Sequence, residues 1–364
     1  AANDVLNQGI VQAGTSVSMK SDIGSITNKG DVEAKGGDVT MDAKTDLHNQ
    51  GVVKASQDVG LTSGQSMANE QAVTAGRNLK MKAGMMLTNG GDLTATNGSI
   101  ELTAQKELLN QGAVQAGTSV TMTSAASSIT NKGDVEAKGG DVTMGAKTDL
   151  RNQGAVTGGQ SVGLTSGQSM TNDKAVTAGQ DLTMDAGTTL TNGGSMANEQ
   201  AVTAGRNLKM KAGTTLTNGG DLTATNGSIE LTAQKELLNQ GAVQAGTTVT
   251  MASAGSSIAN QADVEAKGGD VTMDAKTDLG NQGAVTGGQG VELTSGGSMA
   301  NDKAVTAGTS VTMKSDTGSI TNKGDVEAKG GDVTMDAKTD LHNQGVMKAS
   351  QDVGLTSGQS MANE

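Results

Sequence analysis

The stretch DVEAKGGDVTMDAKTDLHNQG, residues 31–51, decides the fold of this chain. A second stretch, AVTAGRNLKMKAGMMLTNGG at residues 72–91, has the same frame of V-x-A, then V/L-x-M, then L-x-N-x-G. Because the frame recurs every 20 or 21 residues, it outweighs any residue-by-residue prediction. We place seventeen copies after a partial copy at 1–9, and their first residues are 10, 31, 52, 72, 92, 113, 134, 155, 175, 201, 221, 242, 263, 284, 304, 325 and 346.

Apolar residues recur at i and i+2 within each copy, which is the period of a β-strand and not that of a helix. Each copy therefore contains three short strands, whose inward pairs in the copy at 31–51 are Val32/Ala34, Val39/Met41 and Leu47/Asn49. Segments rich in turn-forming residues lie between the strands, where the chain changes direction. The sequence predicts an all-β parallel solenoid of about 17 three-sided coils of 20–21 residues, with strands that pair from coil to coil.

The repeat also predicts the domain organisation. Each coil contacts only its neighbours, so we expect residues 1–364 to form a single rod rather than two or three globular domains. Six residues, SMANEQ at 195–200, fall outside the register. We expect them to be extruded as a loop while the coils on either side stay in register. Neither end has the character of a capping coil, so we expect the chain to be an internal fragment of a larger protein.

Composition restricts the core. The chain has no Phe, Tyr, Trp, Pro or Cys and contains 54 Gly, so the core is expected to be aliphatic, thin and free of disulfides. Of the 19 Met, all but Met85 and Met86 occupy apolar frame positions or lie in the irregular segment. Since the flexible Met side chain fills irregular space, we interpret this set as core and not as metal or redox ligands.

An asparagine follows the third strand's inward apolar residue by two positions in every copy, so alternation places its amide inside. A buried amide needs hydrogen-bond partners, and equivalent asparagines in the coils above and below supply them. We therefore predict a structural asparagine ladder. Its members are Asn28, Asn49, Asn69, Asn89, Asn110, Asn131, Asn152, Asn172, Asn192, Asn218, Asn239, Asn260, Asn281, Asn301, Asn322, Asn343 and Asn363.

The polar residues suggest no catalytic or metal chemistry. His48 and His342 are the only histidines and fourteen coils separate them, so no histidine-based site is expected within one rod. The GGD strings that end at Asp38 and Asp141 lack the nonapeptide pattern of calcium-binding β-rolls. We expect no catalytic residue, no cofactor and no metal.

Charge is banded along the chain. The coil at 31–51 has a net charge of −3 and the coil at 72–91 a net charge of +3, within an overall charge of −12. We interpret these charges as solvated faces, although such bands also suit steering of a partner or lateral packing. The overall acidity and the lack of aromatic residues argue against nucleic-acid binding.

The frame L-x-N-x-G-G followed by V/L-x-A-G-x-x-V/L-x-M/L-x-A resembles the repeats of filamentous haemagglutinin, most plainly in LTNGGDLTATNGSIEL at 87–102 and LTNGGSM at 190–196. The resemblance spans essentially the whole chain. It implies a right-handed parallel β-helix within a bacterial exoprotein that is exported by two-partner secretion. Neither the amino-terminal secretion domain nor a carboxy-terminal effector domain of that family is visible here, so the resemblance concerns the shaft.

Several functions follow from the resemblance as hypotheses. The leading one is a structural and adhesive shaft of a secreted protein on the bacterial cell surface, which binds a receptor of protein or glycan and needs an outer-membrane secretion partner. The alternative is the stalk of a contact-dependent growth-inhibition toxin-delivery protein. A β-helical polysaccharide-active enzyme is a further alternative, but it requires a local cluster of carboxylates and aromatic platforms for sugars, which this chain lacks. We also expect the fragment to self-associate end to end through its open coil edges.

Overall fold

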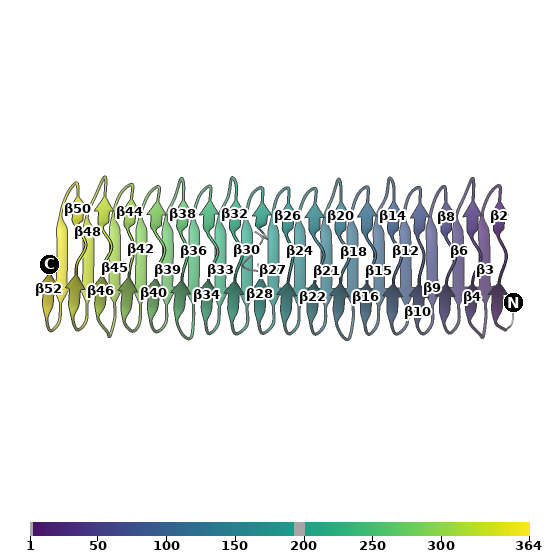
Figure 1. Cartoon of the computed structure of the whole chain (residues 1–364), viewed down its shortest axis with the longest axis horizontal. Coiled ribbons are helices and arrows are strands. Elements are labelled where there is room, and N and C mark those ends of the chain that lie inside the picture. Colours follow the sequence, from purple (N-terminus) through teal and green to yellow (C-terminus); the bar gives the residue numbers. More distant parts are fainter. Residues whose placement is uncertain (1–2, 193–200) are drawn as a thin grey trace. The chain divides into compact units, whose positions relative to one another are not determined.

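The computed structural model describes residues 3–192 and 201–364, and within these ranges the regular structure consists of strands alone. By its contacts the chain divides into two compact units, residues 1–179 and 180–364. Each unit is a stack of three-sided coils whose strands form three parallel sheets (Figure 1). We call them the alanine sheet, the long sheet and the asparagine sheet, after the first, second and third strand of each coil. None of the described residues forms a helix long and apolar enough to cross a membrane.

In unit 1 the strands of each sheet follow one another in chain order, one per coil. The asparagine sheet contains β1 Val5–Asn7, β4 Ile26–Asn28, β7 Leu47–Asn49, β10 Met67–Asn69, β13 Leu87–Asn89, β16 Leu108–Asn110, β19 Ile129–Asn131, β22 Leu150–Asn152 and β25 Met170–Asn172. The alanine sheet contains β2 Val11–Ala13, β5 Val32–Ala34, β8 Val53–Ala55, β11 Val73–Ala75, β14 Leu93–Ala95, β17 Val114–Ala116, β20 Val135–Ala137, β23 Val156–Gly158 and β26 Val176–Ala178. The long sheet contains β3 Val17–Ser21, β6 Val39–Ala43, β9 Val59–Ser63, β12 Leu79–Ala83, β15 Ile100–Ala104, β18 Val120–Ser124, β21 Val142–Ala146 and β24 Val162–Ser166.

Unit 2 repeats the arrangement. Its asparagine sheet contains β28 Leu190–Asn192, β31 Leu216–Asn218, β34 Leu237–Asn239, β37 Ile258–Asn260, β40 Leu279–Asn281, β43 Met299–Asn301, β46 Ile320–Asn322, β49 Leu341–Asn343 and β52 Met361–Asn363. Its alanine sheet contains β29 Val202–Ala204, β32 Leu222–Ala224, β35 Val243–Ala245, β38 Val264–Ala266, β41 Val285–Gly287, β44 Val305–Ala307, β47 Val326–Ala328 and β50 Met347–Ala349. Its long sheet contains β27 Leu182–Ala186, β30 Leu208–Ala212, β33 Ile229–Ala233, β36 Val249–Ser253, β39 Val271–Ala275, β42 Val291–Ser295, β45 Val311–Ser315, β48 Val333–Ala337 and β51 Val353–Ser357.

Pairing is parallel, and it places like residues opposite one another. Val32 of β5 lies opposite Val53 of β8, and Met41 of β6 lies opposite Leu61 of β9. Each strand pairs with the third strand after it, which is the pattern of a coil with three strands per turn. The predicted three-sided parallel solenoid is confirmed. The second strand is longer than its inward pair suggests, because it continues to a third inward residue such as Ala43.

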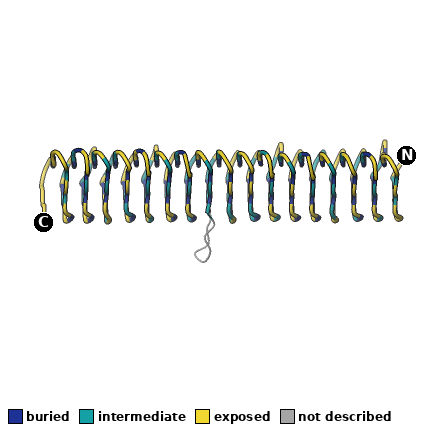
Figure 2. Tube along the Cα trace, turned by 90° about the horizontal axis from the view of Figure 1, so that it is seen from above, coloured by how far each residue is buried: buried dark blue, intermediate teal, exposed yellow. Residues whose placement is uncertain are grey.

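The apolar columns form the core. Val32, Met41 and Leu47 are each at most 1% exposed. Figure 2 shows buried and exposed residues alternating along the coils of each unit, as the strand period requires. Outside the frame, Met86 is 41% exposed; within the frame, Met361 of the last strand, β52, is exposed as well, at 47%.

Glycine has a different role from the one that the sequence suggests. Among the described residues no glycine has a positive φ, so the corners do not depend on left-handed backbone. The close stacking of corners requires glycine instead: a Cβ on Gly154 would overlap the carbonyl oxygen of Gly133 in the coil before it. Glycine therefore sets how closely the coils approach one another.

The irregular segment SMANEQ at 195–200, which we expect to be extruded, lies outside the described residues. On its two sides the columns agree, because Leu182 lies opposite Leu208 in the long sheet and Asn192 lies opposite Asn218 in the asparagine sheet. The single-rod organisation of residues 1–364 stays a prediction.

Candidate functional site

The most regular polar feature of each unit is the asparagine column. Asn110 is fully buried, and its Oδ1 accepts a hydrogen bond from Asn89 Nδ2 at 2.7 Å. Its Nδ2 donates to Asn131 Oδ1 at 2.8 Å and to the carbonyl oxygen of Gly112 at 2.7 Å. Both protons of the amide are therefore used, one toward the next coil and one toward the corner of its own coil. Because each amide has its hydrogen-bond partners, the thin core contains a buried polar column without unpaired polar groups.

The same geometry recurs in unit 2. Asn218 accepts from Asn192 at 2.9 Å and donates to Asn239 at 2.8 Å and to the carbonyl oxygen of Gly220 at 2.7 Å. Of the predicted positions, those from Asn28 to Asn343 are buried and only Asn363 is exposed. The structure adds one member that the sequence did not predict: Asn7 Nδ2 of β1 donates to Asn28 Oδ1 at 2.7 Å.

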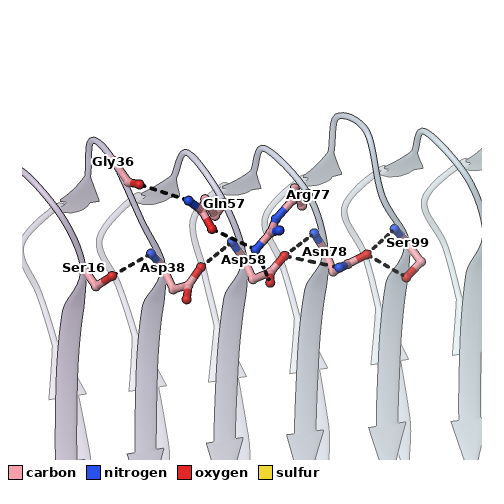
Figure 3. Close-up of polar contacts among 8 residues, drawn as sticks. All are labelled: Ser16, Gly36, Asp38, Gln57, Asp58, Arg77, Asn78 and Ser99. Carbon is pink, nitrogen blue, oxygen red and sulfur yellow. Dashed lines mark hydrogen bonds and ion pairs between the residues drawn. The ribbon is translucent and has the colours of Figure 1, made fainter.

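A second polar column runs along the corner that precedes the long sheet. Figure 3 shows Ser16, Asp38, Asp58, Asn78 and Ser99 following one another, one per coil. A side-chain oxygen of each of the first four accepts a hydrogen bond from the backbone N–H of the next residue in this series, at 3.1, 3.0, 2.9 and 3.1 Å. A side chain thus accepts from the backbone amide at the position directly before each strand of the long sheet begins.

Aspartates make this bond at all three corners, always from the position directly before a strand. The bond lengths lie between 2.7 and 3.2 Å. The accepting residues are Asp4, Asp31, Asp38, Asp46, Asp58, Asp92, Asp134, Asp141, Asp149, Asp181, Asp221, Asp263, Asp270, Asp278, Asp325, Asp332 and Asp340.

The aspartates give the acidic bands a structural role in addition to their exposure to solvent. In the coil at 31–51, Asp31, Asp38 and Asp46 each bind a backbone amide of the following coil. Asp38 and Asp141 belong to the GGD strings considered as calcium turns, and one carboxylate oxygen of each is engaged in this way. In the sequence, the Asp-Val and Asp-Leu pairs at many strand starts were the signal for these hydrogen bonds.

The basic bands are also held between coils. Arg77 Nη2 donates to Gln57 Oε1 at 2.8 Å and lies 3.1 Å from Asp58 Oδ2 (Figure 3). In unit 2, Arg206 makes the equivalent ion pair with Asp181 at 2.5 Å. The coils of Arg77 and Arg206 carry the same sequence, AVTAGRNLKMKAG, and each follows a coil with Gln-Asp at this corner. These bonds join neighbouring coils through the charged surface.

One histidine has a partner on the surface. His48 Nε2 lies 2.5 Å from Glu70 Oε1, and both side chains are well exposed. This hydrogen bond, followed by that from Gln50, holds the pKa of the Glu70 carboxyl below its ordinary value. Two residues of this kind do not make a metal site, and the described residues contain no group of three or more metal-ligating side chains.

Two shallow polar hollows occupy equivalent places in the two units, with volumes of about 370 and 300 Å³. Lys20 Nζ lies 2.9 Å from Asp22 Oδ1 in the first, and Lys314 Nζ lies 2.7 Å from Asp316 Oδ1 in the second. The hydrogen bond that Lys20 donates to Asp22 raises the pKa of the Lys20 amine and lowers the pKa of the Asp22 carboxyl. In each hollow the lysine and the aspartate therefore pair with each other. Throughout the described ranges, no buried polar side-chain atom lacks a hydrogen-bond partner.

Comparison with known proteins agrees with this architecture. A family model described as haemagglutinin repeat matches residues 1–36, 34–96, 74–139, 129–225 and 328–364. The matches cover residues 1–225 without a gap and then 328–364, which is well over half of the chain. The chain belongs to the haemagglutinin repeat family. Neither the curated proteins nor the solved structures returned a match.

The haemagglutinin repeat match confirms the resemblance that the sequence frame suggested. Haemagglutinin repeats are structural and adhesive rather than enzymatic, and the proteins that carry them are secreted surface proteins. Residues 226–327 are not matched, yet they continue the same columns in unit 2, for example through Asn239 and Asn260.

Proposed function

We propose that this chain is part of the structural and adhesive shaft of a large secreted bacterial surface protein. The observation that carries the proposal is the haemagglutinin repeat match on a parallel solenoid whose polar columns bond coil to coil. Such bonds suit a spacer, because every added coil is held by the same contacts as the one before it. Export with an outer-membrane secretion partner and attachment to a protein or glycan receptor belong to the same proposal.

The outward faces supply the adhesive part. On the long sheet, Lys80 and Lys82 of β12 project outward, as do Lys209 and Lys211 of β30 in unit 2. By contrast, the two outward positions of β18 are both threonines, Thr121 and Thr123. Lys80 pairs with Glu101 of β15, and Lys209 pairs with Glu230 of β33. A receptor therefore meets lysines beside carboxylates and threonines, a pattern that offers both charge and hydrogen bonds.

Adhesion is tested by coating beads with the intact chain and counting the cells that attach. We expect attachment above that of uncoated beads. In a matched variant, the four outward lysines of β12 and β30 are replaced by threonine, which occupies the same positions in β18. Reduced attachment with an unchanged unfolding midpoint assigns binding to the basic strands, whereas equal attachment of coated and bare beads contradicts an adhesive role.

The shaft role is tested separately by deleting one coil in register. Removal of residues 72–91 joins Gln71 to Asp92 and lets β8 stack on β14 with all columns preserved. We expect this variant to fold with nearly the stability of the parent. Removal of only residues 72–81 is the control, because it breaks the columns. If the in-register deletion unfolds the chain as the control does, the coils are not interchangeable spacers.

A further inference from the structure

The chain contains the same dipeptide, Asn-Gly, in two structural settings. One setting is the asparagine ladder, with Asn89-Gly90 in unit 1 and Asn218-Gly219 in unit 2; in a third ladder pair, Asn192-Gly193, the glycine lies outside the described residues. The other is the corner between the alanine and long sheets, with Asn97-Gly98 and Asn226-Gly227. An asparagine that precedes glycine is the form most prone to deamidation, since glycine leaves its own backbone nitrogen unhindered as a nucleophile. The two settings differ in whether they permit this chemistry.

In the ladder, every group that must react is held. Asn89 is fully buried, and its Nδ2 donates to Asn110 Oδ1 at 2.7 Å and to the carbonyl oxygen of Gly91 at 2.6 Å. Its Oδ1 accepts from Asn69 Nδ2 at 2.7 Å. The attacking nitrogen is also engaged, because the Gly90 N–H donates to the carbonyl oxygen of Asn69 at 2.7 Å. Attack on the Asn89 side chain requires all four bonds to open.

The ladder of unit 2 repeats these restraints. Asn218 is fully buried, and the Gly219 N–H donates to the carbonyl oxygen of Asn192 at 2.8 Å. The side chain of Asn218 makes the three ladder bonds already described.

At the corner, the restraints are missing. The Asn97 side chain is exposed, and its one hydrogen bond is a donation of 3.1 Å to the carbonyl oxygen of Gly76. The N–H of Gly98 has no hydrogen-bond partner among the described residues. Asn226 is equally exposed, donates to Gly205 at 3.2 Å, and precedes a glycine whose N–H likewise has no partner there.

From this contrast we propose that Asn97 and Asn226 are spontaneous deamidation sites, one in each unit, while folding protects the ladder asparagines. The backbone nitrogen of the following glycine bonds to the side-chain Cγ, and the side-chain nitrogen leaves as ammonia. Water then opens the resulting succinimide at either carbonyl, which gives aspartate or β-linked aspartate. In total, one amide and one water become one carboxylate and one ammonium ion, so no oxidant or enzyme is needed.

The product changes the charge of this corner. A carboxylate at position 97 cannot donate, so the bond to the Gly76 carbonyl is lost. The new charge is placed next to Gly76, the residue directly before Arg77, which binds Gln57 and Asp58. The corner of each unit thereby gains a negative charge beside one of its basic bands. The proposal concerns the chemistry of the chain and does not rest on the proposed function.

Peptide mapping of the intact, folded chain tests the proposal. Cleavage after Lys and Arg gives the peptide 83–106, which contains both Asn89 and Asn97, and the peptide 212–235, which contains both Asn218 and Asn226. The chain is aged at mildly alkaline pH and then digested briefly in acidic buffer. Fragment masses locate the mass increase within each peptide, so the ladder asparagine is an internal control for its corner neighbour.

We expect Asn97 and Asn226 to convert at least about 100-fold faster than Asn89 and Asn218, because four ladder bonds must open and each is worth roughly a factor of five. In urea all four should convert at similar rates, since all precede glycine. An Asn97→Gln variant should lose the signal in unit 1 and keep it in unit 2. Equal rates in the folded chain, or an intact Asn97 or Asn226 under conditions that convert the unfolded chain, overturn the proposal.

Discussion

Replacement of Asn110 by leucine tests whether the ladder stabilises the fold. Leucine has the same number and branching of side-chain heavy atoms as asparagine, so the substitution removes hydrogen bonds without leaving a cavity. Two buried acceptors then lose their donor: the carbonyl oxygen of Gly112 and Oδ1 of Asn131. Asn89 loses one acceptor but still donates to Gly91 at 2.6 Å.

The expected loss follows from these acceptors. An unsatisfied buried polar group costs roughly 1–3 kcal/mol, so the two together predict a loss of about 2 to 6 kcal/mol in the free energy of unfolding. Urea denaturation followed by circular dichroism measures this as a lower midpoint. Because coils interact only with their neighbours, the loss is also expected to be local to the coils around residue 110.

Thr157→Leu is the matched control, since Thr157 lies on the outward side of β23 and is exposed. We expect its midpoint to differ little from that of the parent. An Asn110→Leu chain with the parent's midpoint would refute the idea that the ladder contributes to stability, whatever its geometry.

Two further predictions concern a corner glycine and the response to acid. Gly154→Ala should lower the free energy of unfolding by about 1 to 3 kcal/mol, because its Cβ overlaps the Gly133 carbonyl. Gly163→Ala is the control: the space around its new Cβ is open, so it should be neutral or slightly stabilising in the same urea titration. Acid should lower the stability of the folded chain. The backbone amide and hydroxyl of Ser25 hold the pKa of the Asp4 carboxyl below its ordinary value of 3.8. The hydrogen bond from His48 likewise holds the pKa of the Glu70 carboxyl below its ordinary value of 4.5. A lowered carboxyl pKa stabilises the folded state above the ordinary value, and this contribution is lost as the pH falls through the folded-state pKa. The urea midpoint should therefore stay level from about pH 7 to pH 5 and fall below about pH 4, and a midpoint that is level to pH 2 contradicts this.

The candidate polar sites differ in how far the sequence predicts them. Asn110 is predictable because it stands two residues after Leu108 in a strand whose alternation is unambiguous, so its amide faces inward. Its bond to Gly112 is not predictable in this way, since it depends on how the backbone turns after the strand. The carboxylate of Asp58 is less predictable still. Its partner is the backbone of Asn78, and only the stacked coils bring the two together.

The amino-acid sequence by itself determined the period, the three strands of each coil and the inward columns, because alternation in a repeat leaves one consistent set of inward faces. Only the tertiary structure decided what the corners do. There, aspartates such as Asp38 bind the amides of the next coil, and glycines such as Gly154 set the approach of neighbouring backbones. The physical reason is that these contacts are made with backbone groups about 20 residues away, and backbone groups are the same at every residue, so residue types alone do not reveal the contact.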